Sequence, residues 1–320
     1  MGSSKTVVLA ALFANGAIAI LKFVAFLLTG SASMLSETYH SISDTGNQVF
    51  LLIGIRYGGQ EADRTHPFGY GKAQFFYSFL VSVFLFGIAG WESAKHGFSK
   101  LTAGGGHAGT GAVEFLGFSY DPSLSFDPVY VSYTVLLGAF AFETYALVKA
   151  RAEMLRQMDR HGWDGYPEAF RKTSDVTTLT ALTEDAVALA GIVLALVGLV
   201  LEQATGNAIY DAAAAFAIGL MLMGFALALA WENKRLILGE SMPANEERKL
   251  RELVADWEGV EDVVDFRTIY FGPERIVVTA DVALADHLDS DSMDERISAI
   301  EAALKEHEPA IRTVYIEPET

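Results

Sequence analysis

The 320-residue sequence contains no cysteine, which excludes disulfide bonds, cysteine-bound zinc and thiol catalysis. Basic residues are scarce as well, because 23 Lys and Arg stand against 40 Asp and Glu and give a formal net charge of −17. A chain this acidic lacks the basic face that nucleic-acid phosphates require, so we expect no nucleic-acid partner. A His-Glu-X-X-His pair is also absent, which counts against an intramembrane metallohydrolase.

Hydrophobic residues, by contrast, make up 51% of the chain, and the mean hydropathy is +0.28. A soluble protein of this size usually scores below zero, and a membrane helix needs about 20 mostly apolar residues. Six segments meet that length and predict a multi-pass protein in the cell membrane, surrounded by lipid. They are residues 6–29, 33–56, 74–96, 128–149, 176–201 and 210–232. The first run is too long for a cleavable signal peptide.

The distribution of Lys and Arg among the connections predicts the orientation of these spans. The loops after spans 1 and 5 have no Lys or Arg, and the loop after span 3 has Lys95 and Lys100. The other side is much richer in basic residues, so we expect both termini in the cytoplasm. Its basic residues are Lys5, Arg56, Arg64, Lys72, Lys149, Arg151, Arg156, Arg160, Arg171, Lys172, Lys234 and Arg235.

The chain changes character near residue 240, which predicts a 1–240 transmembrane domain and a 241–320 cytoplasmic domain. The tail holds 20 acidic and 8 basic residues and no run long enough to span a membrane. Apolar periodicity predicts helices at 244–257 and 290–307 and strands at 260–270, 275–284 and 312–316, with a turn at 271–273. The order αββαβ is typical of a small, ferredoxin-like α+β domain. Its core is small, so we expect it to dimerise and to act as a dimerisation and regulatory domain.

Ionisable side chains inside a predicted span are costly in lipid and are therefore candidates for function. In span 2, His40 and Asp44 are four residues apart and share one helix face. An imidazole nitrogen with a carboxylate oxygen suits a borderline divalent metal, although a polar pair that hydrogen-bonds neighbouring helices has the same spacing. Asn47, one turn further, is a weaker candidate, as an outer-sphere group or a helix–helix hydrogen bond. Lys22, Glu92 and Glu143, in or at the ends of other spans, are interpreted as structural pairing groups, with snorkelling to the membrane surface and proton relay as the alternatives.

Span 5 carries a second candidate half-site, because Glu184 and Asp185 are adjacent carboxylates in an apolar run. A cation opposite them would remove the difficulty of placing two unpaired carboxylates in lipid. Small residues follow Glu184 at helical spacing and indicate a close approach to a neighbouring helix. These residues are Ala188, Gly191, Ala195 and Gly198.

The motifs around these positions resemble those of the cation diffusion facilitator family, in the branch whose fifth helix carries a Glu-Asp pair. Segment 30–48 is similar to the family's second-helix signature and includes Ser-Glu-Thr-Tyr-His-Ser-Ile-Ser-Asp. Segment 66–71, His-Pro-Phe-Gly-Tyr-Gly, resembles the motif that leads into its third helix. Segments 211–212 and 234–240 resemble its sixth helix and exit. The likeness extends over nearly the whole chain, including the tail.

The resemblance implies a homodimeric metal–proton antiporter with a tetrahedral metal site between helices 2 and 5. It implies that His40, Asp44 and Asp185 are metal ligands. The usual fourth ligand position is Ala181 in this chain, which departs from the family pattern. Glu184 is our candidate for the missing ligand, and water is the alternative.

Two accessory family sites are degraded. The loop between helices 2 and 3 keeps Asp63 and His66, but the second family histidine is Tyr70. The loop is interpreted either as a weak partial metal site or, preferably, as a solvated segment. In the tail, the family's zinc positions fall near Ala280, Tyr315 and Glu317, which predicts that the binuclear zinc centre is absent.

Together these features predict a proton-coupled antiporter that exports a divalent transition metal from the cytoplasm, and not an enzyme. The metal, zinc or manganese with iron as a further candidate, is substrate, the other partner is the proton, and no organic cofactor is expected. A non-transporting membrane metal sensor or scaffold is the alternative, and an intramembrane metallohydrolase is the third hypothesis.

Overall fold

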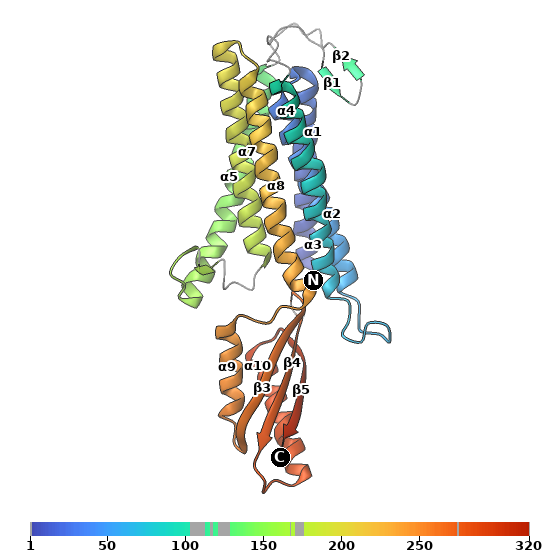
Figure 1. Cartoon of the computed structure of the whole chain (residues 1–320), viewed down its shortest axis with the longest axis vertical. Helices are drawn as coiled ribbons and strands as arrows, with labels where there is room; N and C mark the ends of the chain where they lie inside the picture. The colour runs from blue at the N-terminus through green and yellow to red at the C-terminus, as the bar shows by residue number, and fades with distance from the viewer. Residues whose placement is uncertain are drawn as a thin grey trace. The chain divides into compact units, whose positions relative to one another are not determined.

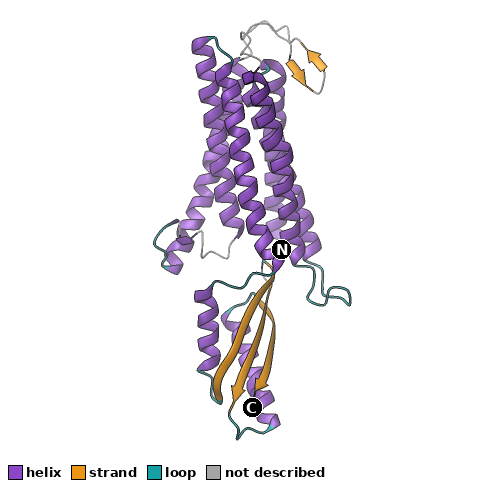
Figure 2. Ribbon diagram, in the orientation of Figure 1, coloured by secondary structure: helices purple, strands orange, loops and turns teal. Residues whose placement is uncertain are grey.

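The computed structural model describes residues 2–102, 113–115, 118–120, 129–166, 168–169, 176–273 and 275–319. Its contacts divide the chain into two units. One unit comprises Met1–Leu52 and Ser78–Trp231, and the other comprises Ile53–Tyr77 and Glu232–Thr320. Figure 1 shows the long helices of the first unit running side by side, and Figure 2 shows that the strands of the second unit form one sheet.

Each of the six predicted spans corresponds to a helical rod in the described ranges. The rods are α1 (Gly2–Thr29), α2 (Ala32–Gly58), the continuous segment α3 (Lys72–Phe84), η1 (Leu85–Gly90) and α4 (Trp91–Thr102), α5 (Val129–His161), α7 (Val176–Thr205) and α8 (Ile209–Leu238). A short antiparallel hairpin, β1 (Val113–Phe115) and β2 (Phe118–Tyr120), lies between α4 and α5. Five rods are long and apolar enough to cross a membrane. Helix α2 does not reach that threshold because of its polar residues.

Two features of the rods differ from the sequence prediction. The third rod contains a π-helical segment, η1. The fourth rod, α5, continues to His161, twelve residues beyond the predicted end at 149. The π segment ends at Gly90, where an added Cβ would lie 2.5 Å from Met223 Cγ of α8. A π turn widens the helix locally, and this one lies directly before the close contact with α8.

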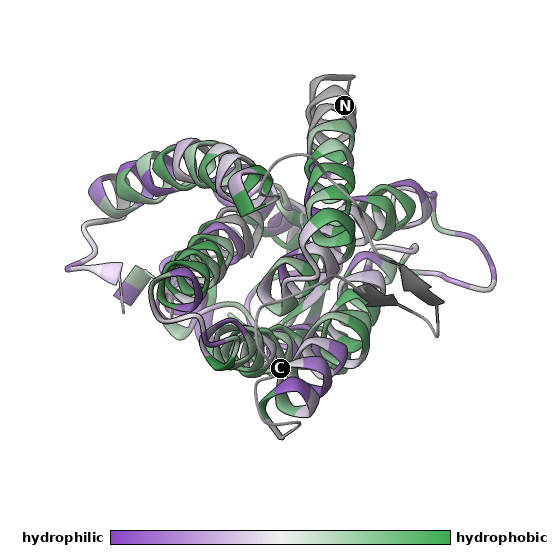
Figure 3. Ribbon diagram, turned by 90° about the horizontal axis from the view of Figure 1, so that it is seen from above, coloured by the Kyte–Doolittle hydropathy of each residue, from purple (hydrophilic) through white to green (hydrophobic). Residues whose placement is uncertain are grey.

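The bundle is held together by tight packing of its interior. Its fully buried side chains include Phe26, Met34, Leu136, Ile192 and Leu222. In lipid the hydrophobic effect does not drive helices together, so close contact and interhelical hydrogen bonds have to do so. Large apolar side chains are exposed on the long helices, and Figure 3 shows green, hydrophobic segments along them with white and purple ones between. This is the pattern expected for a multi-pass membrane protein.

Asp211 at the start of α8 caps the N-terminus of α2. Its carboxylate accepts hydrogen bonds from Ser31 Oγ at 2.8 Å, from the Ala32 amide at 2.5 Å, and from the amide and hydroxyl of Ser33. The first amides of a helix have no partner within the helix, and a negative charge there also interacts favourably with the helix dipole. Asp211 is only 3% exposed, so these bonds tie two spans together inside the bundle.

The C-terminal part of the chain confirms the predicted αββαβ order. Its elements are α9 (Ala244–Ala255), β3 (Val260–Gly272), β4 (Arg275–Leu284), α10 (Ser290–His307) and β5 (Ile311–Glu319). The sheet order is β3-β4-β5, antiparallel between β3 and β4 and parallel between β4 and β5. Leu250 and Val254 of α9 and Ile300 and Leu304 of α10 are buried against the sheet. Helix α10 begins where Asp289 accepts a hydrogen bond from the Ser292 amide at 2.9 Å.

Candidate metal centre

Helix α2 buries His40 in a setting that leaves its imidazole available. The side chain is 1% exposed, and neither ring nitrogen has a hydrogen-bond partner among the described residues. His40 Nδ1 lies 3.5 Å from Asp44 Oδ1, as the four-residue spacing predicts. Other polar side chains of this helix are already satisfied, because the hydroxyls of Ser36 and Thr38 donate to carbonyls one turn earlier. Among the described residues of this stretch, the His40 ring nitrogens and Oε1 of Glu37 are the buried polar atoms that still lack a hydrogen-bond partner.

The helix–helix contact between α2 and α7 brings further candidate residues together. Asn47 Nδ2 donates to both carboxylate oxygens of Glu184, at 3.3 and 3.2 Å. Glu184 and Asp44 are also electrostatic neighbours of one another. Glu184 thus faces α2, which is the direction that the stripe of small residues predicts.

Asp185 follows Glu184 in α7. Its strongest electrostatic neighbours are Glu143 of α5 and Glu184. In the described part of the chain, no three His, Asp or Glu side chains converge closely enough to enclose one metal ion. The side chain of Ala181 lies outside the described residues. The four-residue site His40, Asp44, Glu184 and Asp185 therefore stays a prediction.

The small residues of α7 allow the close approach that their spacing predicts. A Cβ added at Gly191 would lie 2.5 Å from Glu37 Oε1 of α2, and one at Gly198 would lie 2.6 Å from Ala214 Cβ of α8. Ala188 and Ala195 are also buried. Helix α7 therefore packs with its small-residue face against both α2 and α8.

A buried ion pair joins α1 to α2. Lys22 Nζ lies 2.7 Å from Glu37 Oε2, and the two side chains are 1% and 0% exposed. The prediction that Lys22 pairs is confirmed, but sequence reasoning did not identify Glu37 as its partner. The available signal was that Lys22 and Glu37 are charges of opposite sign in two consecutive predicted spans.

A cavity of about 350 Å³ lies beside Asp211, where α7 ends and α8 begins. Its lining includes Lys100, Glu202 and Ser132, and Lys100 Nζ donates to the Gly30 carbonyl at 2.7 Å. The sequence alone does not predict this cavity, because its lining residues come from helices that are far apart in the chain.

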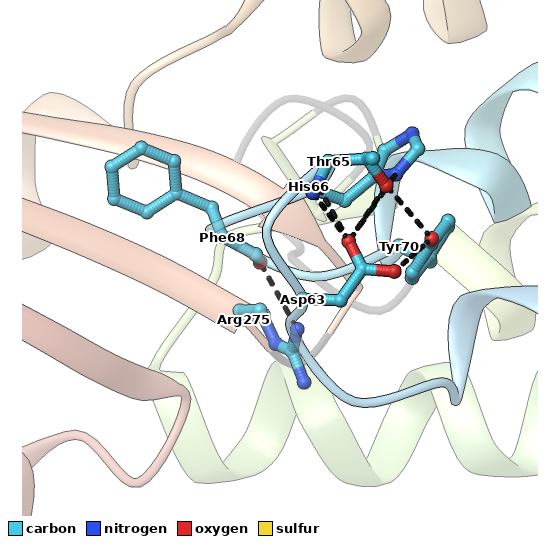
Figure 4. Close-up of polar contacts among 6 residues, drawn as sticks. All are labelled: Asp63, Thr65, His66, Phe68, Tyr70 and Arg275. Atoms are coloured by element: carbon cyan, nitrogen blue, oxygen red, sulfur yellow. Dashed lines mark hydrogen bonds and ion pairs between the residues drawn. The ribbon is translucent and has the colours of Figure 1, made fainter.

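The loop between α2 and α3 satisfies Asp63 with hydrogen bonds (Figure 4). Its Oδ1 accepts from the Thr65 amide and hydroxyl at 2.8 and 2.7 Å and from the His66 amide at 2.7 Å. Its Oδ2 accepts from the Tyr70 hydroxyl at 2.7 Å, so the carboxylate has donors at about all four of its lone-pair positions. These bonds hold the pKa of Asp63 well below its usual range. The arrangement favours a hydrogen-bonded, solvent-exposed loop over a metal site.

The same loop contacts the sheet. Arg275 Nη1 donates to the Phe68 carbonyl at 3.1 Å, and the rings of Phe68 and Phe271 are 4.9 Å apart.

The family's zinc positions in the tail do not share one face of the sheet. Ala280 is 2% exposed and faces the core, whereas Tyr315 is 54% exposed. Tyr315 is paired with Thr279 and not with Ala280, so these two positions lie on opposite faces.

Comparison with known proteins identifies the family. The family described as the cation efflux transmembrane domain matches residues 8–238, and the one described as the cation efflux protein cytoplasmic domain matches residues 242–320. The chain belongs to the cation diffusion facilitator family. The resemblance to the family is thereby confirmed, and membership of the branch with a Glu-Asp pair in its fifth helix stays a prediction. The family consists of cation-efflux transporters, so the prediction that the chain is not an enzyme is also confirmed.

The chain is similar to family members from distant organisms. It is 28% identical over 276 residues to the proton-coupled zinc antiporter SLC30A9, mitochondrial, of Homo sapiens, and equally so to that of Mus musculus. Each match covers 86% of this chain and 45% of the relative, so the chain spans about half the length of these curated relatives. It is 26% identical over 279 residues to the cation-efflux pump FieF of Serratia proteamaculans (strain 568). That match covers 85% of this chain and 79% of the pump.

Proposed function

We propose that this protein is a proton-coupled antiporter that exports a divalent transition metal from the cytoplasm. The observation that carries the proposal is the buried imidazole of His40, without a hydrogen-bond partner among the described residues, beside Asp44 on the helix whose Asn47 contacts Glu184. Burying a polar ring away from water without a hydrogen bond costs free energy, and a divalent cation would supply the missing interaction. We place Asp185 in the same site, as the ligand that a small movement of α7 would add.

Coupling to protons follows from the chemistry of these ligands. A metal binds the neutral imidazole and the ionised carboxylates, so loading the site displaces protons and protonation expels the metal. A proton gradient can therefore drive export. Asn47 would hold the Glu184 carboxylate in place in the unloaded carrier, because it donates to both of its oxygens.

Zinc is the first candidate substrate, because the similar human and mouse proteins are named zinc antiporters. One imidazole with two or three carboxylates is a harder ligand set than a two-histidine site. Such a set also suits manganese and iron, which therefore remain candidates. A site that combines these ligands would select by coordination geometry rather than by affinity alone.

We further propose a homodimer in the cell membrane, with both termini in the cytoplasm. The orientation rests on the surplus of Lys and Arg in the connections on that side. Dimerisation rests on the tail, whose family match is to the cytoplasmic domain of cation-efflux proteins.

The test is metal transport by the purified full chain in proteoliposomes under a pH gradient. Zinc, manganese, iron and cadmium are assayed in parallel, and at least one should be taken up in a gradient-dependent way. His40→Ala should abolish that uptake, and His287→Ala, at an exposed histidine of the tail, is the matched control that should retain it. Absence of flux for all four metals in correctly inserted protein would overturn the proposal.

A further inference from the structure

The Lys22–Glu37 pair is incompletely satisfied. Lys22 Nζ contacts Glu37 Oε2 at 2.7 Å, but Oε1 of the same carboxylate has no hydrogen-bond partner among the described residues. The Glu37 side chain is 0% exposed, so solvent does not reach that oxygen either. A buried ion pair is stable when its remaining lone pairs are also hydrogen-bonded. The bare oxygen is thus an open coordination position in the middle of the bundle.

Glu37 also lies on the face of α2 that holds the candidate metal site. Glu37, His40 and Asp44 follow one another at i, i+3 and i+7, which places them along one side of the helix. Glu37 lies about 4.5 Å from His40 along the helix axis, towards the N-terminus of α2. Its bare oxygen points at Gly191 of α7, where the missing side chain leaves it room. Oε1 of Glu37 and both ring nitrogens of His40 are thus buried without a hydrogen-bond partner in the described part of the chain, and a neutral imidazole offers one of its nitrogens to a metal.

We propose that Glu37 is a second binding position for the transported cation, and that Lys22 is a tethered ammonium group that occupies it in the empty carrier. The proposal rests on the proposed transport function. An ammonium ion and a divalent metal are both cations that bind a carboxylate, so the metal competes with Lys22 for Glu37. When the metal binds Glu37 and His40, Lys22 leaves, and when the metal leaves, Lys22 returns and neutralises the carboxylate.

The surroundings of Lys22 suit such an exchange. Glu143 of α5 is buried and lies within electrostatic range of both Lys22 and Glu37. A displaced ammonium group therefore has a second carboxylate nearby and is not left unpaired in an apolar interior. Because Lys22 is on α1 and Glu143 is on α5, the exchange would couple cation binding on α2 to the contacts of two other helices.

A purely structural ion pair makes different predictions, and zinc-binding measurements separate the two. The experiment measures the zinc dissociation constant and the melting temperature of the purified full chain in detergent, with zinc supplied in chelator-buffered solution. The variants are Lys22→Gln, Glu37→Gln and the double variant. The matched control is the double variant Lys95→Gln/Glu92→Gln, which removes the exposed pair of α4, whose atoms are 3.5 Å apart.

If Lys22 competes with the metal, Lys22→Gln should bind zinc roughly tenfold more tightly than the parent, because the competitor is gone. Glu37→Gln should bind roughly tenfold more weakly, as is typical when a group that supports metal binding is lost. The double variant should resemble Glu37→Gln in affinity. It leaves no unpaired charge, so it provides the test even if the single variants do not fold.

The proposal is overturned if the double variant and both single variants bind zinc with the parent's affinity. The pair would then be structural, and the single variants would only melt at lower temperature, with recovery in the double variant. If the parent itself binds none of zinc, manganese, iron and cadmium, the proposed transport function fails and this inference fails with it. Metal binding by the parent protein distinguishes these two failures, because the parent still binds metal if only this inference is wrong.

Discussion

Replacing Gly219 of α8 with alanine should loosen the contact between α8 and α4. A Cβ at this position would lie 2.3 Å from the backbone nitrogen of Ala94 and 2.7 Å from its Cα. Favourable contact between carbon atoms begins at about 3.5 Å, so the two helices would have to separate by about 1 Å. Overpacking of this kind costs about 1–3 kcal/mol. The cost at Gly219 should lie at the upper end of this range, because the opposing atoms belong to the backbone of Ala94 and cannot rotate away.

Gly224, five residues further along α8, provides the matched control. A Cβ there would have no atom within 4 Å, and alanine stabilises a helix by about 1 kcal/mol relative to glycine. The same propensity gain applies at Gly219, so the two variants should differ in stability by the overpacking cost alone, about 3 kcal/mol. At about 2–4 °C for each kcal/mol, this is a difference of roughly 6–12 °C in melting temperature.

The assay is thermal unfolding of both purified variants in one detergent, followed by circular dichroism. Gly219→Ala should melt below the parent, and Gly224→Ala at or above it. Equal melting temperatures for the two variants would refute the close α4–α8 approach. A further substitution, Gly97→Ala, tests the same contact from α4, because its Cβ would lie 2.5 Å from the Phe216 amide nitrogen.

Three other predictions follow from the polar residues. Asp44→Ala should abolish metal transport but leave membrane insertion intact, and normal flux in proteoliposomes would contradict the site. Glu184→Gln should weaken zinc affinity and change the number of protons released per zinc, both measurable by calorimetry in buffers of different ionisation enthalpy; values equal to the parent's would make water the fourth ligand. Since the folded-state pKa of Asp63 is lowered, its stabilisation of the loop is present above the ordinary value of about 4 and is lost as the pH falls towards the folded-state pKa. Local disorder of Thr65 and Tyr70, followed by NMR, should therefore appear only in acid.

The tail was the most predictable part of the fold. Helix α10 has the predicted bounds, 290–307, and β4 has the predicted bounds, 275–284. Both have strong local signals: the apolar spacing of the helix, its capping residue Asp289, and a turn before the strand. Strand β5 extends beyond the predicted 312–316 to Ile311–Glu319, since its acidic end pairs with β4 in a register that local periodicity does not contain.

The bundle was predictable in outline and less so in its contacts. The sequence indicated six spans, the shared face of His40 and Asp44, and the direction of Glu184, because helical spacing alone determines these. It did not indicate the π segment η1 or the pairing of Lys22 with Glu37. Both depend on which helices are neighbours in space, and spacing within one helix carries no information about that.

The Asp211 cap has a mechanical consequence for α2. Because this carboxylate holds the amides of Ala32 and Ser33, the start of α2 is fixed to α8, and a tilt of α2 would have to pivot there. Asp44 is twelve residues from Ala32, which is about 18 Å along the axis. A tilt of about 10° would carry Asp44 roughly 3 Å away from Glu184 while the fixed end stayed nearly still. Helix α2 would then act as a lever that opens the bundle at the end distant from Asp211, with the proposed metal ligands His40 and Asp44 on its moving arm.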